Sequence, residues 1–129
     1  MSVRLFVGDR RVESGADAVL AEGRGIAYGD GVFETMRAVD GTIPWWPAHR
    51  ARLVSGAARL GIALPSDQCF DEALHDCLSQ HRDAVIKLIV ARGSGGRGYA
   101  PMPAAPPVWV LMASALPAPM RPGGLNLCW

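Results

Sequence analysis

The sequence is poor in lysine and carries almost no net charge. Its 129 residues include twelve arginines but a single lysine, Lys87. The 13 basic and 12 acidic residues leave a net charge of +1, which gives no electrostatic reason to expect nucleic acid or an anionic membrane as a partner. No run approaches 18 consecutive apolar residues, so no membrane span is predicted. The first residues lack the apolar segment of a signal peptide, and a cytoplasmic location is expected.

Cysteine is equally scarce. Cys69, Cys77 and Cys128 form no C-x-x-C pair, and no histidines cluster near them. An odd number of cysteines at these spacings argues against a disulfide framework and against structural zinc. We therefore expect free thiols and no metal site.

Apolar residues make up 50% of the chain, which is enough to form one domain with a hydrophobic core. Gly8-Asp9 and Asp40-Gly41 predict two hairpin turns. Pro47 and Ser66 predict helix starts. The predicted strands are 3–7, 10–12, 32–39, 42–46, 84–91 and 107–116, and the predicted helices cover 47–62 and 66–78.

This order keeps strands and helices apart along the chain, which is typical of an α+β domain. We expect an antiparallel sheet with two helices packed on one side. Residues 1–117 are predicted to form this domain. Residues 118–129 are predicted to be an interdomain linker and the start of a C-terminal domain that the chain does not include.

The stretch "RGSGGRGY" at 92–99 contains the spacing G-x-G-x-x-G after a predicted strand. A dinucleotide site would need a helix directly after these glycines, because the helix N-terminus binds the pyrophosphate. The following "APMPAAPP" is too rich in proline to form that helix. Two interpretations stay open: a solvated connector, or an anion-binding loop in which Arg97 receives a carboxylate.

Two other stretches have the same ambiguity. In "AYGDGVFETMR", one interpretation is that Asp30 and its glycines simply shape a bend, and the other is that Tyr28 and Phe33 are walls of a pocket. His49 and Arg52 are three residues apart and share one face of the first predicted helix. They are either solvated surface groups or the holders of an anion.

Together, "YGDGVFETMRAVDG", the H-x-x-R-L run at 49–53 and "KLIVARGSGGRGY" resemble the fold-type IV pyridoxal-phosphate enzymes. That family includes branched-chain and D-amino-acid aminotransferases and 4-amino-4-deoxychorismate lyases, and the third stretch is most similar to the lyases. The resemblance implies a homodimeric enzyme that uses pyridoxal 5′-phosphate. It implies that Arg52 binds the cofactor phosphate and that Arg97, with Tyr99 beside it, binds a substrate carboxylate. Tyr28 and Phe33 would line the substrate cavity.

One expected residue is absent. By the resemblance, the Schiff-base lysine lies in the C-terminal domain, beyond Trp129, so no catalytic residue is expected in this chain. Lys87 is interpreted as a strand lysine with its amine at solvent. The sequence therefore predicts the N-terminal part of a lyase that releases pyruvate and 4-aminobenzoate in folate synthesis, inactive alone and not expected to retain the cofactor. An aminotransferase of the same fold and a non-catalytic binding domain are the alternatives.

Overall fold

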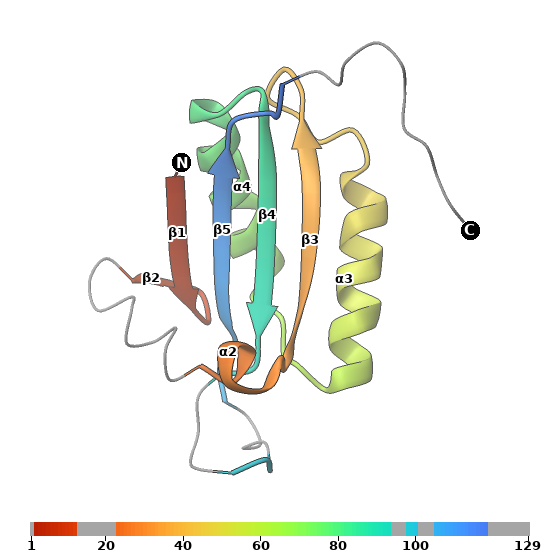
Figure 1. Cartoon of the computed structure of the whole chain (residues 1–129), viewed down its shortest axis with the longest axis vertical. Helices are drawn as coiled ribbons and strands as arrows, with labels where there is room; N and C mark the ends of the chain where they lie inside the picture. Colours follow the sequence, from red (N-terminus) through yellow and green to blue (C-terminus); the bar gives the residue numbers. More distant parts are fainter. Residues whose placement is uncertain (1, 13–22, 94–97, 101–104, 119–129) are drawn as a thin grey trace.

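The computed structural model describes residues 2–12, 23–93, 98–100 and 105–118. These residues form a five-stranded antiparallel sheet in the order β2-β1-β5-β4-β3, with three helices (Figure 1). The fold is α+β, as predicted. The elements are β1 (Ser2–Val7), β2 (Arg10–Val12), α2 (Arg24–Tyr28), β3 (Gly31–Ala38), α3 (Trp46–Leu60), α4 (Asp67–Gln80), β4 (Ala84–Ala91) and β5 (Val108–Ser114).

The two long helices begin within one residue and end within two residues of their predicted bounds. Pro47 lies in the first turn of α3, and Gly61 ends it in the left-handed conformation, with φ of 63°. The hydroxyl of Ser66 accepts a hydrogen bond from the backbone N–H of Cys69 and caps α4. Both helices lie on the same side of the sheet, with α4 behind the central strands and α3 beside β3 (Figure 1).

The core lies between these helices and alternate residues of the strands. The Trp109 ring stacks on Phe6 at 3.9 Å between centroids and meets Phe70 of α4 at 5.0 Å. Trp109 and Leu111 are 1% and 0% exposed. They point to the helix side of β5, where the strand alternation puts them in the core.

Two local predictions also need correction. Residues 42–46 do not form a strand, because only an isolated bridge joins Val39 to Thr42 before the chain turns into α3. The strand β3 pairs instead with β4. Arg24 and Gly25 end a small, polar and glycine-dotted stretch that is typical of a loop, yet they begin the short helix α2. The predicted linker and C-terminal start lie outside the described residues, apart from position 118.

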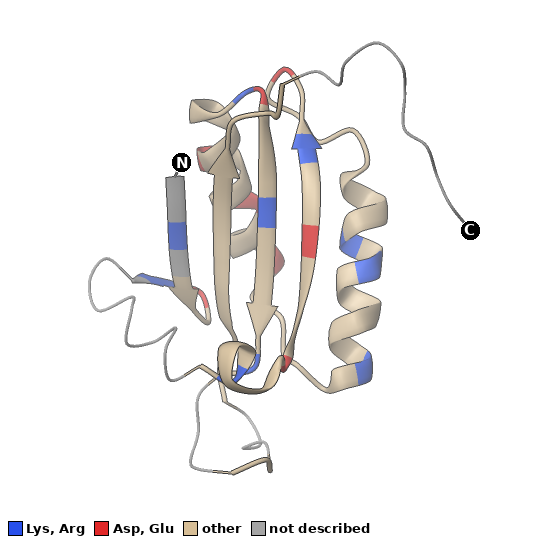
Figure 2. Ribbon diagram, in the orientation of Figure 1, with Lys and Arg blue, Asp and Glu red and all other residues tan. Residues whose placement is uncertain are grey.

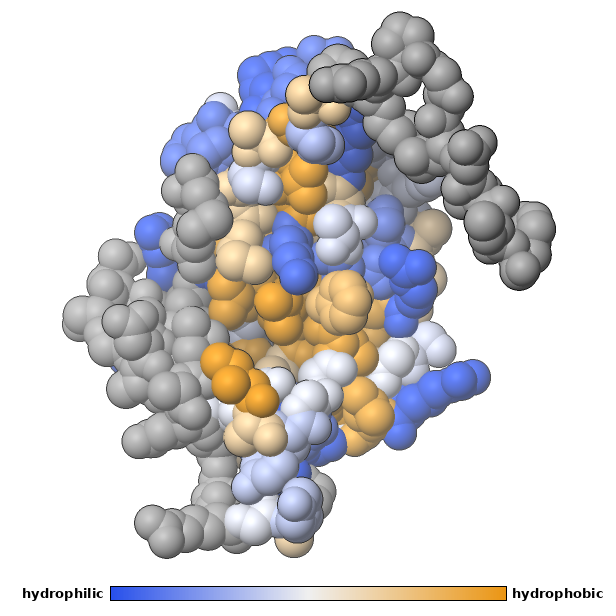
Figure 3. Space-filling model, viewed as in Figure 1, coloured by the Kyte–Doolittle hydropathy of each residue, from blue (hydrophilic) through white to orange (hydrophobic). Residues whose placement is uncertain are grey.

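The other face of the sheet carries no long helix among the described elements, and only α2 lies at one end of it (Figure 1). We call this the open face. It is formed by alternate residues of β3, β4 and β5, and Figure 3 shows that apolar side chains dominate it. Any site on this sheet that is open to a ligand lies here or at the edge strand β3.

Candidate functional site

A depression of about 480 Å³ lies on the open face, against α2. Its walls are almost entirely apolar and include glycines that flank Arg24 and Asp30. The lining residues are Gly23, Gly25, Ile26, Gly29, Gly31, Val32, Phe33, Ile89, Ala91, Val108, Val110 and Met112. A cavity of this size with apolar walls suits an organic ligand with a ring or an alkyl group.

Glycine is required in this wall because α2 approaches β4 closely. A Cβ on Gly25 would lie 2.7 Å from the Cβ of Ala91, and a Cβ on Gly31 would lie 2.8 Å from the carbonyl oxygen of Val90. Real Cβ atoms essentially never come this close to such neighbours. The glycines around Asp30 therefore bring α2 onto the sheet and set the shape of the depression.

The single lysine of the chain lies on the open face. Register pairing places Lys87 directly between Thr35 on β3 and Met112 on β5. Its Nζ lies 5.5 Å from the centroid of the Phe33 ring, and the residue is half-buried. Figure 2 shows how few charged positions accompany it on the central strands. The interpretation of Lys87 as a strand lysine is confirmed, and its amine lies near an exposed aromatic ring on this face.

Strand periodicity was the signal that could have identified this position. Val85, Lys87 and Ile89 alternate with the buried Ile86 and Leu88, so all three point away from the helices. What the sequence did not reveal was that this face of β4 lacks a covering helix in the described structure.

Of the predicted cavity residues, Phe33 lines the depression and is 65% exposed. Tyr28 does not line it but lies at its end, next to Gly29. The Tyr28 ring contacts the Tyr99 ring at 5.3 Å between centroids, so these two predicted residues are brought together. Arg97, predicted to bind a carboxylate, lies outside the described residues.

Arg52, the predicted phosphate ligand, is bound to a buried carboxylate. Its Nε donates to Oε1 of Glu34 at 2.7 Å, and its Nη2 donates to Oε2 at 2.5 Å. His49 Nδ1 lies 2.6 Å from the same Oε2. The shared face predicted for His49 and Arg52 is confirmed, and both side chains meet an internal acid. Sequence reasoning missed Glu34 because nothing in "VFETM" separates it from an ordinary strand glutamate.

The electrostatics of the Glu34–Arg52 pair favour the charged carboxylate. The hydrogen bond from Arg52 lowers the pKa of Glu34 against the opposing effect of burial, and His49 lowers it further. Glu34 in turn raises the pKa of Arg52. The Glu34 side chain is 1% exposed and that of Arg52 is 71% exposed. The carboxylate therefore anchors the inner edge of the guanidinium, while the outer part is open to an anion.

Arg52 and Phe33 lie on different sides of the β3 backbone, since Phe33 faces the open side and Glu34 faces α3. Because β3 ends the sheet order, both residues are accessible from the same sheet edge. A ligand that meets Phe33 and Arg52 together would therefore lie along the outer side of β3.

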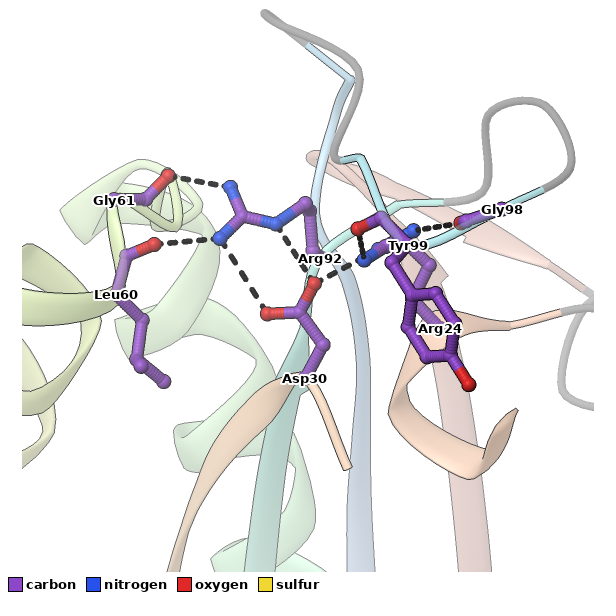
Figure 4. A network of polar contacts seen from close by, with 7 residues as sticks. All are labelled: Arg24, Asp30, Leu60, Gly61, Arg92, Gly98 and Tyr99. Atoms are coloured by element: carbon purple, nitrogen blue, oxygen red, sulfur yellow. Dashed lines mark hydrogen bonds and ion pairs between the residues drawn. The ribbon is translucent and has the colours of Figure 1, made fainter. Parts of the chain in front are cut away.

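A second polar network joins the end of the depression to the "RGSGGRGY" stretch at 92–99, which we call the glycine-rich loop (Figure 4). Oδ2 of Asp30 accepts from Arg24 Nε at 2.8 Å and from Arg92 Nε at 2.9 Å. The other nitrogens of the two arginines donate to backbone carbonyls, Arg24 to Gly98 and Tyr99, and Arg92 to Leu60 and Gly61. We call this network the Asp30 clamp. The Arg92 hydrogen bond is the main cause of a lowered Asp30 pKa.

The first glycine of "RGSGGRGY" has a packing role. A Cβ on Gly93 would lie 2.0 Å from the carbonyl oxygen of Pro106, so the backbone passes too closely for any side chain. Arg92 turns back into the clamp and is not a solvated loop charge. In this part of the loop, glycine permits close packing, and the next described element along the chain is the strand β5 from Val108.

The fold and these motifs can now be compared with known proteins. The sequence model of the class IV aminotransferase family matches residues 31–128. The chain belongs to the class IV aminotransferase family. It is 38% identical to 4-amino-4-deoxychorismate lyase from Pseudomonas aeruginosa, whose structure superposes with a TM-score of 0.74 over 90% of this chain and 41% of that one. It is 35% identical to D-alanine aminotransferase from Bacillus licheniformis, over 75% of this chain and 35% of the relative.

A third similarity concerns the cofactor. The pyridoxal-phosphate-bound form of a hypothetical aminotransferase from Mycobacterium tuberculosis is 26% identical, with a TM-score of 0.68 over 89% of this chain and 40% of that one. The present chain spans less than half the length of the curated relatives that it matches. Fold-type IV enzymes, lyases and aminotransferases alike, depend on this cofactor.

The described residues fit one end of pyridoxal phosphate. The outer edge of Arg52, fixed from behind by Glu34, suits a phosphate, and the exposed Phe33 ring suits an aromatic ligand. The described residues do not supply a partner for the pyridine ring of the cofactor. None of the open-face residues of β3, β4 and β5 is acidic, so no carboxylate on these strands can pair with the pyridine nitrogen.

No helix among the described residues is long and apolar enough to cross a membrane.

Proposed function

We propose that this chain is the N-terminal part of a 4-amino-4-deoxychorismate lyase, which releases pyruvate and leaves 4-aminobenzoate. The observation that carries the proposal is the place of Lys87 on the open face. Its amine lies over Phe33, and the residue is paired with Thr35 on one side and with the apolar Met112 on the other.

A half-buried cation in such surroundings favours an anionic ligand. No ion pair joins Lys87 to an acidic group of the described residues. A ligand carboxylate bound there would compensate the charge and gain a charge-assisted hydrogen bond. Aminodeoxychorismate carries two carboxylates, so a lysine on this face and an arginine on the glycine-rich loop could each receive one. An aliphatic amino acid has only one carboxylate to place.

The other predicted residues take parts in the same proposal. Arg52 would hold the cofactor phosphate, with Glu34 fixing the direction of its guanidinium. Phe33 would form a wall for the substrate, and Tyr28 and Tyr99 would border the cavity. Arg97 would bind the second carboxylate. Bound pyridoxal phosphate supplies an electron sink for the carbanion that elimination requires.

Amino transfer by the same fold is the second candidate, favoured by the 35% identity to D-alanine aminotransferase. A lyase needs no keto acid as acceptor, whereas an aminotransferase does. The full-length protein is also proposed to be a cytoplasmic homodimer, which analytical ultracentrifugation of the intact enzyme would test.

The experiment is a comparison of full-length wild-type enzyme with Lys87→Met and a matched control, Arg59→Met on the exposed surface of α3. We expect Lys87→Met to raise KM for aminodeoxychorismate roughly 10- to 100-fold, as expected for a lost charge-assisted contact. It should retain the visible absorbance of the bound cofactor. Unchanged KM, or an absorbance lost only in Lys87→Met, would contradict the role given to Lys87.

A further inference from the structure

The Asp30 clamp ties together parts of the chain that are far apart in sequence. Asp30 is six residues from Arg24 and 62 from Arg92. Arg24 spans a further 74 and 75 residues to the carbonyls of Gly98 and Tyr99. Through these bonds one carboxylate joins α2, the start of β3, the end of β4 and the far end of the glycine-rich loop (Figure 4).

The clamp is too well enclosed to be an ordinary surface ion pair. The side chains of Arg24, Asp30 and Arg92 are 8%, 15% and 14% exposed. Two guanidinium groups share one carboxylate, so the cluster keeps a net positive charge. Its remaining N–H groups are directed to backbone carbonyls, which compensate part of that charge. Removal of the Asp30 charge would therefore leave two enclosed cations facing one another.

The two arginines hold different parts of the chain in place. Arg92 donates to the carbonyls of Leu60 and Gly61, where α3 ends and the carbonyls lack helical partners. It therefore anchors the clamp to the rigid part of the domain. Arg24 holds the backbone of Gly98 and Tyr99, and its guanidinium carbon lies 4.8 Å from the Tyr28 ring centroid. It therefore fixes both members of the tyrosine pair.

We propose that Asp30 is a positioning residue that, by aligning Arg24, places Tyr99 against Tyr28 at the end of the substrate depression. Without this alignment little in the described structure holds the tyrosine pair, because Tyr99 is 85% exposed. The glycines that flank Arg24 and Asp30 line the depression itself. The clamp thus determines the form of that wall and the position of the loop end, without touching a substrate.

The consequence for catalysis rests on the proposed function. A residue that shapes the cavity wall contributes to binding in the ground state and the transition state alike, so its loss should raise KM more than it lowers kcat. A misplaced wall or loop end can cost on the order of 10- to 100-fold in such a site. We expect Asp30→Asn to raise KM for aminodeoxychorismate by roughly that factor, with kcat within about threefold.

Asp40→Asn is the matched control. Asp40 lies in a turn at the far end of β3 and has a φ of 50°, which asparagine tolerates. Its substitution removes the same negative charge as Asp30→Asn. Arg24→Lys is a second, milder variant that keeps the positive charge but loses the planar fork needed for Asp30 and two carbonyls. Tryptophan fluorescence, dominated in the core by Trp109, reports whether each variant is folded.

The position of the tyrosines can be measured without any activity. Selective tyrosine labelling of the full-length enzyme, with Tyr28→Phe and Tyr99→Phe to assign the two ring signals, lets an NOE between these rings report their contact. We expect this NOE in wild type and Asp40→Asn, and its loss in folded Asp30→Asn and Arg24→Lys. Its persistence in both clamp variants would overturn the proposal.

The two proposals fail separately. If the wild-type enzyme does not act on aminodeoxychorismate, the proposed function is wrong, and the NOE still decides the role of Asp30. If the enzyme is active and the NOE is lost while KM stays within twofold of wild type, the clamp positions the tyrosines but not the substrate, and the inference is overturned.

Discussion

The pair formed by Glu34 and Arg52 should respond very differently to the loss of one partner or the other. Glu34 is 1% exposed and Arg52 is 71% exposed at the side chain. Glu34→Gln keeps the shape of the buried group and removes its charge. Arg52→Met keeps the aliphatic stem and leaves a buried carboxylate with His49 as its remaining partner.

The magnitudes follow from this asymmetry. In Glu34→Gln the guanidinium can turn to water, so the loss is that of hydrogen bonds to a charged group, about 1–2 kcal/mol in unfolding free energy. Arg52→Met should be the more destabilising change, because it leaves a charge uncompensated in the interior. The double variant should be more stable than Arg52→Met alone, since Glu34→Gln removes that charge.

The pH dependence of stability should differ between wild type and Arg52→Met. In wild type, Arg52 lowers the pKa of Glu34, so the stability it gives is present above the unfolded pKa and is lost as pH falls through the folded pKa. In Arg52→Met, the pKa of Glu34 should lie above its value in wild type, because burial raises it and only His49 still lowers it. Relative to wild type, that variant should therefore gain stability when the pH is lowered from 7 to 5.

Urea unfolding followed by tryptophan fluorescence at both pH values measures all four proteins. Equal destabilisation by the two single changes, additivity in the double variant, and no relative gain at pH 5 would together refute the reasoning that the buried carboxylate dominates this pair.

Three further changes test the packing. Gly93→Ala should destabilise the domain by about 1–3 kcal/mol in urea unfolding, because its Cβ would meet the Pro106 carbonyl. Trp109→Ala should cost about 3–5 kcal/mol by the same assay, since its ring is enclosed between two phenylalanines. Ser66→Ala should cost about 0.5–2 kcal/mol through the lost cap of α4, measured by circular dichroism during thermal unfolding.

Most of the fold could be predicted because its signals are local. The strand 84–91 is identified by its β-branched residues alone, and the two long helices by Pro47, Gly61 and Ser66. The predicted strand at 42–46 is wrong because a good hairpin turn specifies the bend, while the partner of β3 is decided by the longer register with β4. That pairing depends on tertiary contacts that the turn does not encode.

The site was less accessible to sequence reasoning for the same reason. The sequence singled out Arg52 but not Glu34, which becomes a partner only when α3 packs on β3. Asp30 was interpreted as part of a bend, although its carboxylate meets an arginine 62 residues away. Lys87 was placed on a strand correctly, but which face of that strand a helix covers is a property of the whole domain.

Product analysis with and without an acceptor tests the central claim most directly. The full-length protein is incubated with aminodeoxychorismate in the absence of any keto acid, and pyruvate and 4-aminobenzoate are quantified. The account predicts both products in equal amounts. Turnover that begins only when a keto acid is added, with the amino group transferred to it and no 4-aminobenzoate formed, would contradict it.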